Sequence, residues 1–259
     1  MKKEQLNSIK EFLDEKAYLY NNKSFIETDP IQIPHLFTKK EDVEIAGFLT
    51  STIAWGQRKS IIKNANQLMQ WMDMEPHEFI CNAKPKDLAV FKKFVHRTFN
   101  GEDCVFFIQS LQNIYTKHGG LENAFSENLS KKEATSYACI NSFRSRFFSI
   151  QYPLRTQKHV SNPESGSSAK RLCMYLRWMV RKDNNGVDFG IWKSISPSNL
   201  YLPLDVHTGN ISRKLGLLQR TQNDWKAVTE ISEMLKLFDP KDPIRYDFAL
   251  FGLGAFEKF

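Results

Sequence analysis

The segment LPLDVHTGNISRKLG, residues 202–216, combines a helix start and a helix end in one short stretch. Asp205 is of the residue type that caps a helix N-terminus, because its carboxylate accepts hydrogen bonds from the first free backbone N–H groups. Gly216 is of the type that follows a helix, since glycine adopts the left-handed conformation without strain. We therefore expect a helix between these residues. His207, in its first turn, is either a packed, hydrogen-bonded histidine or part of a functional site.

A second informative segment, PESGSSAKRL at residues 163–172, runs from small residues into a helix. The free backbone N–H groups at such a helix start suit a phosphate. Lys170 falls in the first helical turn, where a positive charge opposes the helix dipole. In the plain structural interpretation, Ser167 or Ser168 is the N-cap and Lys170 is a surface lysine. Its unfavourable position leaves open that another group holds the lysine there.

Helical periodicity dominates the rest of the chain. We expect helices at about 4–20, 41–54, 61–72, 87–96, 103–117, 120–129, 135–150, 169–182, 205–216, 222–237 and 243–256. The one short strand candidate is VDFGIW, residues 187–192. These patterns predict an all-α fold, a two-lobed helical bundle of about ten or more helices. We expect residues 1–259 to form a single all-α unit, with lobes at 30–150 and at 1–29 plus 151–259 and a cleft between them.

The composition excludes several classes of protein. With 259 residues, of which 41% are hydrophobic, the chain is neither disordered nor dependent on disulfide bonds for its stability. It has no run of about 20 apolar residues and no apolar stretch at its N-terminus, so we expect a cytoplasmic protein without a membrane partner. Cys81, Cys104, Cys139 and Cys173 lie far apart, which predicts reduced and mostly buried thiols rather than a metal site.

The positive charge is concentrated in one part of the chain. The net charge is +7, yet residues 131–182 alone carry eleven basic and two acidic residues, a net charge of +9. The remainder therefore sums to −2. A concentrated basic block is typical of a protein that binds a polyanion such as a nucleic acid. The alternative is a solvated surface that keeps the protein soluble.

The two segments together resemble the helix-hairpin-helix DNA glycosylase superfamily, and the 8-oxoguanine glycosylase branches most closely. In that family a hydrophobic-Pro-hydrophobic-Asp-x-His pattern, here Leu202–His207, precedes a helix that carries an arginine. In its bifunctional members a catalytic lysine starts the helix after a Gly-rich hairpin, which is the place of Lys170. YDFALFGLG, residues 246–254, is similar to the late helix behind the catalytic aspartate, and 43–69 to an early helix. The chain also resembles an uncharacterised bacterial family of conserved proteins that shares these segments.

The resemblance implies a DNA base-excision glycosylase with associated abasic-site lyase activity. It implies a monomer that acts on an oxidised purine in damaged double-stranded DNA and needs no cofactor, since the cysteine cluster of the iron–sulfur members is missing. Asp205 would stabilise the positive charge that develops on the sugar when the base leaves. Lys170 would form a Schiff base at C1′, which requires a neutral amine. The helix N-terminus, burial and Arg171 would each favour that neutral form.

Further residues are assigned to DNA contacts by the same reasoning. We expect Gly166, Ser167, Ser168, Arg171, His207, Gln57 and Arg58 to contact DNA, and Phe189, Trp192 and Trp55 to line a pocket for the extruded base. For the pocket residues the alternative is core packing, and for the turn at 55–58 it is the end of a helix. Arg171, Arg177 and Arg181 would either follow the DNA backbone or face water.

Two other functions stay open. The glycine pair that is usual in the hairpin is reduced to Gly166, and this favours a catalytically inactive nucleic-acid-binding protein of the same fold. Such a protein would show salt-dependent binding that survives Asp205→Asn. The third possibility is an interaction protein with no nucleic-acid role, which would bind neither DNA nor RNA at low salt.

Overall fold

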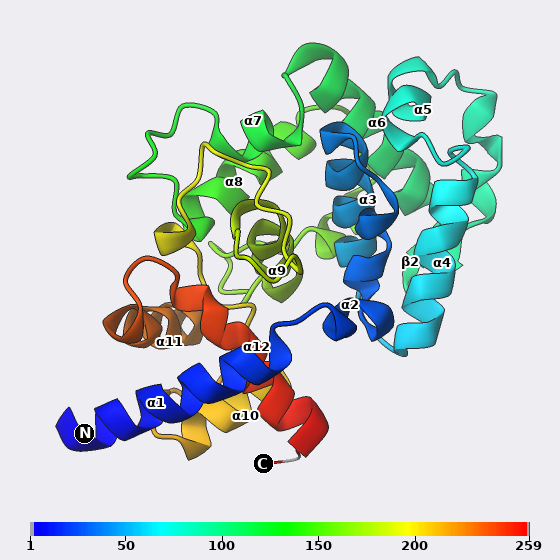
Figure 1. Cartoon of the computed structure of the whole chain (residues 1–259). Coiled ribbons are helices and arrows are strands. Elements are labelled where there is room, and N and C mark those ends of the chain that lie inside the picture. Colours follow the sequence, from blue (N-terminus) through cyan, green and yellow to red (C-terminus); the bar gives the residue numbers. More distant parts are fainter. Residues whose placement is uncertain (1–2, 258) are drawn as a thin grey trace. The chain divides into compact units, whose positions relative to one another are not determined.

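The computed structural model of the chain describes residues 3–257 and 259, and within them helices make up nearly all of the regular structure (Figure 1). Twelve α-helices lie in this part of the chain: α1 (Lys3–Tyr20), α2 (Ser24–Thr28), α3 (Lys40–Thr52), α4 (Arg58–Gln70), α5 (Pro76–Asn82), α6 (Gly101–Lys117), α7 (Leu121–Ser126), α8 (Ser136–Phe147), α9 (Lys170–Val180), α10 (Val206–Lys214), α11 (Trp225–Phe238) and α12 (Tyr246–Gly252). The predicted all-α fold of ten or more helices is confirmed.

Shorter elements connect these helices. The 3₁₀ turns are η1 (Pro30–Gln32), η2 (Pro34–Leu36), η3 (Asp87–Ala89), η4 (Phe91–Lys93), η5 (Leu154–His159), η6 (Pro197–Asn199) and η7 (Pro243–Arg245), and the π-turn η8 (Leu253–Glu257) extends α12. The two strands, β1 (Val95–His96) and β2 (Phe99–Asn100), form an antiparallel hairpin in which Val95 pairs with Asn100.

The chain divides into two compact units. The terminal unit comprises Met1–Phe25, Lys131–Ser136 and Asn162–Phe259, and the inserted unit comprises Ile26–Ser130 and Tyr137–Ser161. These bounds differ from the expected lobes in three short segments, the first of which, residues 26–29, joins the inserted unit. Residues 131–136 join the terminal unit, where the buried Ser136 hydroxyl accepts a hydrogen bond of 2.9 Å from the Tyr201 N–H. Residues 151–161 join the inserted unit, because Arg155 and neighbouring residues surround a buried aspartate, Asp103.

Phenylalanine rings fill the core of the inserted unit. Phe48 of α3, Phe107 of α6 and Phe143 of α8 are completely buried, with centroids of Phe48 and Phe107 5.7 Å apart. Phe125 of α7 stacks on Phe143 at 4.2 Å. Aromatic pairs of this kind add to the stability that burial of their apolar area already supplies. The high phenylalanine content of the chain therefore serves its core.

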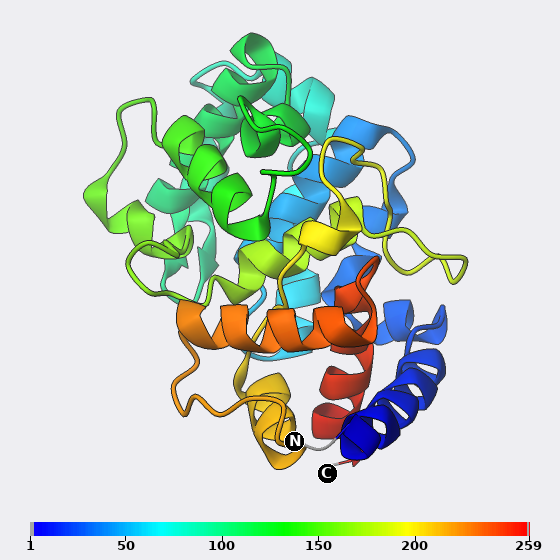
Figure 2. The ribbon, with the colours of Figure 1, turned by 90° about the vertical axis from the view of Figure 1, so that its left-hand side faces the viewer.

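In the terminal unit, α1 lies along α12, and α10 contacts α12 as well (Figure 1, Figure 2). Gly252 of α12 permits the close approach, since a β-carbon at this position would come within 2.1 Å of the Tyr20 ring of α1. Across the same contact, the Tyr246 hydroxyl donates a 2.9 Å hydrogen bond to Asp14. The last helix is thereby held between the first helix and the helix that Asp205 begins.

Two predictions of local structure are wrong. Residues 87–96 do not form one helix but η3, η4 and β1. Leu88, Phe91 and Phe94 recur every three residues, which matches the three residues per turn of a 3₁₀ helix. Residues 187–192 form no strand but a loop along the end of α9, where the Trp192 N–H donates to the Met179 carbonyl at 2.9 Å.

The four cysteines are free thiols; Cys104, Cys139 and Cys173 are buried and Cys81 is partly exposed. Burial raises the pKa of the Cys139 thiol to about 12 and that of the other two buried thiols further. These thiols are therefore unreactive core residues, as the sequence predicts. Among residues 3–257 and 259, no helix combines the length and the apolar character that crossing a bilayer requires.

Candidate functional site

Lys170 is the first residue of α9, and a tight hairpin directly precedes it. In this hairpin the Gly166 N–H donates to the Pro163 carbonyl at 2.9 Å and the Ser167 N–H donates to the Asn162 carbonyl at 3.2 Å. Gly166 has a φ of +85°, a conformation that glycine adopts freely. The tight turn at residues 162–167 therefore requires the glycine that the sequence supplies.

The N-cap of α9 is Ala169, and neither serine takes that place. Ala169 has a φ of +45° in the left-handed region and is buried, a strained arrangement for a residue with a β-carbon. The Ser167 hydroxyl instead accepts a 3.2 Å hydrogen bond from the Ala169 N–H and so supports the bend. The interpretation of Ser167 or Ser168 as the N-cap is therefore wrong. Strain of this kind persists only where the surrounding structure holds it.

Asp205 caps α10, as the sequence predicts. Its Oδ1 accepts a 2.9 Å hydrogen bond from the Thr208 N–H and a 3.2 Å bond from the Thr208 hydroxyl. In return, the Asp205 N–H donates to the Thr208 hydroxyl at 2.9 Å, which completes a capping box. These bonds hold the Asp205 carboxylate in one orientation.

The structure brings Lys170 and Asp205 together, although they are 35 residues apart in the chain. Lys170 Nζ lies 3.4 Å from Asp205 Oδ2, the oxygen that the cap does not use. The side chains are 31% and 21% exposed, so both groups can be reached from solvent. The two oxygens of the carboxylate therefore have different partners: Oδ1 accepts the capping hydrogen bonds, and Oδ2 faces the amine.

A buried carboxyl group, Asp247 of α12, is electrostatically coupled to this pair. Burial raises the pKa of Asp247 to about 6; the nearby Asp205 also raises it, while Arg177 and Lys170 oppose the shift. Arg177 Nη1 donates a hydrogen bond to Asp247 Oδ2. Asp247 was not among the site residues predicted from the sequence, although an aspartate inside an apolar helix is a signal, because a buried charge needs a partner.

Arg177 of α9 and Arg181, the residue after that helix, do not face water or a DNA backbone, so that prediction is wrong for both. Arg177 Nε lies 3.2 Å from Asp188, and Arg181 Nη1 lies 3.0 Å from the other oxygen of the same carboxylate. Arg181 Nε also donates to Asp242 at 3.0 Å. The Arg177 guanidinium lies 4.4 Å from the centre of the Phe248 ring. Both arginines therefore tie α9 to the segments that surround it.

Other arginines of the basic block are used in the same way. In the inserted unit Arg155 Nη1 lies 2.5 Å from the buried Asp103, Arg146 pairs with Glu127, and Arg144 donates to the Val160 carbonyl. The exposed members of the block are lysines: Lys131, Lys132, Lys158 and Lys182. The block is therefore a weaker polyanion surface than its formal charge of +9 predicts.

The remaining residues assigned to DNA contacts in the terminal unit lie at the two helix starts. Gly166 and His207 are exposed, and Ser167, Ser168 and Arg171 are partly exposed. His207 is thus not the packed core histidine of the alternative interpretation. Burial lowers the pKa of the Arg171 guanidinium to about 10, which still leaves it charged at neutral pH.

The residues expected to line a base pocket have different surroundings, and Trp55 belongs to a different unit from the other two. Trp192 is 1% exposed and packs edge-on against Tyr175 at 5.4 Å, so its expected place in an open pocket is wrong. Phe189 is partly exposed. Trp55 belongs to the inserted unit, where its ring lies 5.1 Å from His96. Gln57 and Arg58 follow it at the start of α4.

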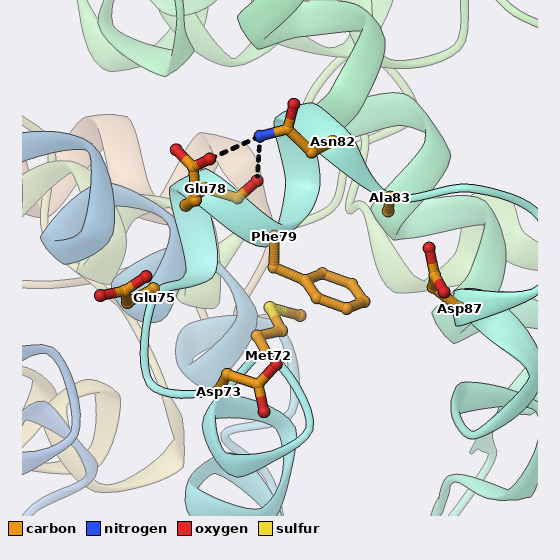
Figure 3. A pocket seen from close by; sticks show the side chains of 8 residues that line it. All are labelled: Met72, Asp73, Glu75, Glu78, Phe79, Asn82, Ala83 and Asp87. Carbon is orange, nitrogen blue, oxygen red and sulfur yellow. Dashed lines mark hydrogen bonds between the residues drawn. The ribbon is translucent and has the colours of Figure 1, made fainter.

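The inserted unit contains an open pocket of about 460 Å³ between α5 and the segments around it (Figure 3). Met72 and Phe79 form its apolar part, and four carboxylates line it: Asp73, Glu75, Glu78 and Asp87. Glu78 accepts a 2.8 Å hydrogen bond from the Asn82 amide, which holds that carboxylate at the rim. Because these groups repel phosphate, the pocket does not suit a polyanion.

Within the described residues, no cluster of three or more His, Cys, Asp or Glu side chains is arranged to hold a metal ion. The chemistry that the Lys170–Asp205 pair itself can supply is that of an amine nucleophile beside a carboxylate.

Comparison with known proteins places most of the chain in one family. A family described as a protein of unknown function (DUF2400) matches residues 29–256, which include Lys170, Asp205 and Asp247. Neither the curated proteins nor the solved structures contain a match. Because the match covers far more than half of its length, the chain belongs to the DUF2400 family.

Proposed function

We propose that this protein is a DNA base-excision glycosylase with abasic-site lyase activity that acts on an oxidised purine. The observation that carries the proposal is the distance of 3.4 Å between Lys170 Nζ and Asp205 Oδ2. A hairpin precedes the lysine, and a capping box holds the aspartate. The resemblance of both segments to helix-hairpin-helix glycosylases adds the substrate class. Charged groups that are partly exposed and fixed in orientation are what a catalytic amine and carboxylate require.

The pair accounts for each step of the reaction. In the ion pair the lysine is an ammonium group, and Asp205 Oδ2 is placed to take the proton that the amine must lose before it attacks. The free amine forms a bond to C1′ while the base leaves with the electrons of the glycosidic bond and takes up the proton that Asp205 accepted, which ionises the carboxylate again. The ionised carboxylate then stabilises the positive charge on the sugar.

Strand cleavage follows from the same lysine. Opening of the sugar ring converts the C1′ adduct into a protonated Schiff base, which acidifies the proton at C2′. Loss of that proton breaks the C3′–O3′ bond and releases the 3′ strand as a phosphate. Water then hydrolyses the Schiff base and returns the amine of Lys170.

Borohydride trapping tests the proposal. Duplex DNA that carries 8-oxoguanine or an abasic site is incubated with the protein and borohydride, which reduces a Schiff base to a stable covalent adduct. We expect an adduct with the wild-type protein, none with Lys170→Ala, and a wild-type level with Lys182→Ala, the exposed lysine after the same helix. Asp205→Asn should slow base release by on the order of 10²-fold, because it removes a charge placed for the transition state.

The absence of an adduct with the wild-type protein, or an adduct that persists in Lys170→Ala, would refute the mechanism. If duplex DNA nevertheless binds with a steep salt dependence and Asp205→Asn leaves this binding unchanged, the protein is a catalytically inactive nucleic-acid-binding protein. If no DNA or RNA binds at low salt, neither function holds.

A further inference from the structure

One short segment of the terminal unit contacts both the hairpin that precedes Lys170 and the backbone of Asp205. This brace segment, Asn223–Trp225, consists of the last two residues before α11 and the first residue of that helix. It is connected to the hairpin of Lys170 on one side and to the start of α10 on the other. Lys170 and Asp205 are far apart in the chain, so the distance between their side chains in the folded protein depends on such a common support.

The contact with the start of α10 is made by the Asn223 side chain. Its Nδ2 donates a 3.0 Å hydrogen bond to the backbone carbonyl of Asp205. Its Oδ1 accepts a 2.6 Å hydrogen bond from Arg213 Nη2, which lies near the end of α10. The amide of Asn223 therefore links both ends of this short helix.

The close fit of Asn223 depends on a glycine. A β-carbon at Gly209 would come within 2.7 Å of Asn223 Oδ1, closer than such atoms can approach. Gly209 lies in the middle of α10, where glycine destabilises a helix relative to alanine. The space that it leaves is the space that Asn223 occupies.

The contact with the hairpin is made by the backbone. The Trp225 N–H donates a 3.0 Å hydrogen bond to the Gly166 carbonyl, and Ser167 and Asp224 form an antiparallel bridge. Asp224 caps α11 through a 3.1 Å bond from the Ala227 N–H. A hydrogen bond from Arg220 lowers the pKa of Asp224 to about 2, so this cap stays charged. The hairpin is thus attached to the rigid start of a long helix.

The same helix also holds the chain that leads to Asp205. The Ser232 hydroxyl of α11 accepts a 2.9 Å hydrogen bond from the Leu202 N–H. Tyr201 stacks on Trp225 with ring centres 5.7 Å apart. The hairpin before Lys170 and the chain that leads to Asp205 are therefore both attached to α11.

We propose that Asn223 is a positioning residue, which together with the brace segment sets the distance between the Lys170 amine and the Asp205 carboxylate. This inference rests on the proposed function for its catalytic consequence, but the distance itself does not depend on any substrate. Misplacement of a reacting group by about 1 Å can reduce a rate by on the order of 10²-fold. A residue that touches neither reacting group can therefore control the reaction.

Two variants test the contact from different sides. Asn223→Asp keeps the size of the side chain and the acceptor for Arg213 but replaces the donor to the Asp205 carbonyl with an oxygen. Gly209→Ala pushes the Asn223 side chain away without changing it. The matched control is Thr221→Ala, an exposed residue of the same loop. Each variant is compared with wild type in the rate of single-turnover trapping on abasic DNA, in DNA affinity and in thermal stability.

We expect both variants to lower the trapping rate by about 10-fold or more, while DNA affinity changes by less than about twofold. A loss of structure would instead reduce affinity, stability and rate together. Thr221→Ala should match wild type in all three. A wild-type trapping rate in both Asn223→Asp and Gly209→Ala would overturn the proposal.

A second measurement does not involve DNA. The rate at which an acetylating reagent modifies Lys170 is measured by mass spectrometry, with the exposed Lys182 as the internal standard. The Asp205 carboxylate lies 3.4 Å from the amine and limits its contact with the reagent, so acetylation should become several-fold faster in both variants. If wild type traps no DNA, the proposed function fails, and the acetylation rate alone decides on the positioning role: unchanged values in both variants overturn it.

Discussion

Helix α9 and the residue that follows it, Arg181, include two kinds of basic side chain that differ in what they do. Lys170 at the helix start is 31% exposed and faces one carboxylate, whereas Arg177 and Arg181 are 5% and 3% exposed and bind several. The buried ion pairs fix the helix in the terminal unit, and the exposed pair remains accessible to a ligand. Equal charges along a sequence therefore have unequal functions, and burial decides between them.

The largest effect on stability is expected from removing the buried ion pairs of Arg177. Arg177→Ala leaves Asp188 and Asp247 without this partner in a buried site, so the free energy of unfolding should fall by about 3–5 kcal/mol. Urea denaturation measures this change. Lys182→Ala, the control at an exposed lysine after the helix, should change stability by less than about 0.5 kcal/mol. A loss below 1 kcal/mol in Arg177→Ala would show that the buried pairs contribute little.

An intermediate effect is expected from the pH dependence of stability through Asp247. Its pKa is raised from 3.8 to about 6, so the folded state binds a proton more tightly than the unfolded state. Protonated Asp247 therefore contributes on the order of 3 kcal/mol to the free energy of unfolding below pH 4. This contribution is lost as the pH rises through 6. Denaturation of wild type and Asp247→Asn between pH 4 and pH 7 measures it as the change in their difference. A difference that is constant over this range would show that Asp247 is not perturbed.

The smallest effect on stability is expected from the accessible pair. Lys170→Ala should change the free energy of unfolding by less than about 1 kcal/mol, because partly exposed ion pairs contribute little and the lysine opposes the helix dipole. Asp205→Ala should cost about 1 kcal/mol, the usual effect of losing an N-cap. Thermal unfolding measures both. A large destabilisation by Lys170→Ala would assign the pair to the fold and weaken the proposed catalytic role.

Local sequence signals predicted the helix starts well and the connections less well. Asp205 caps its helix because capping depends on residue type and on neighbours within three positions. The segment 87–96 was assigned the wrong helix type, because its three-residue spacing is close to that of an α-helix. The strand expected at 187–192 failed because its hydrogen bonds go to the end of α9, a partner that sequence does not reveal.

The candidate site shows the same division. The pair of Lys170 and Asp205 followed from the resemblance of two segments, and the structure places them 3.4 Å apart. Asn223 and Asp247 were missed, since each acts through contacts with segments distant in the chain. Trp192 was assigned to a pocket and lies in the core, because an aromatic residue suits both environments equally.

Local patterns in the sequence are sufficient for the all-α class and for the capped start of α10, because periodicity and capping depend on near neighbours. The formal charge of the basic block follows directly from the residues in it. The packing of the folded chain decided which of those charges are buried, since burial depends on what lies against each side chain. It likewise decided the distance between the amine of Lys170 and the carboxylate of Asp205, which is set by hydrogen bonds to a third segment, Asn223–Trp225.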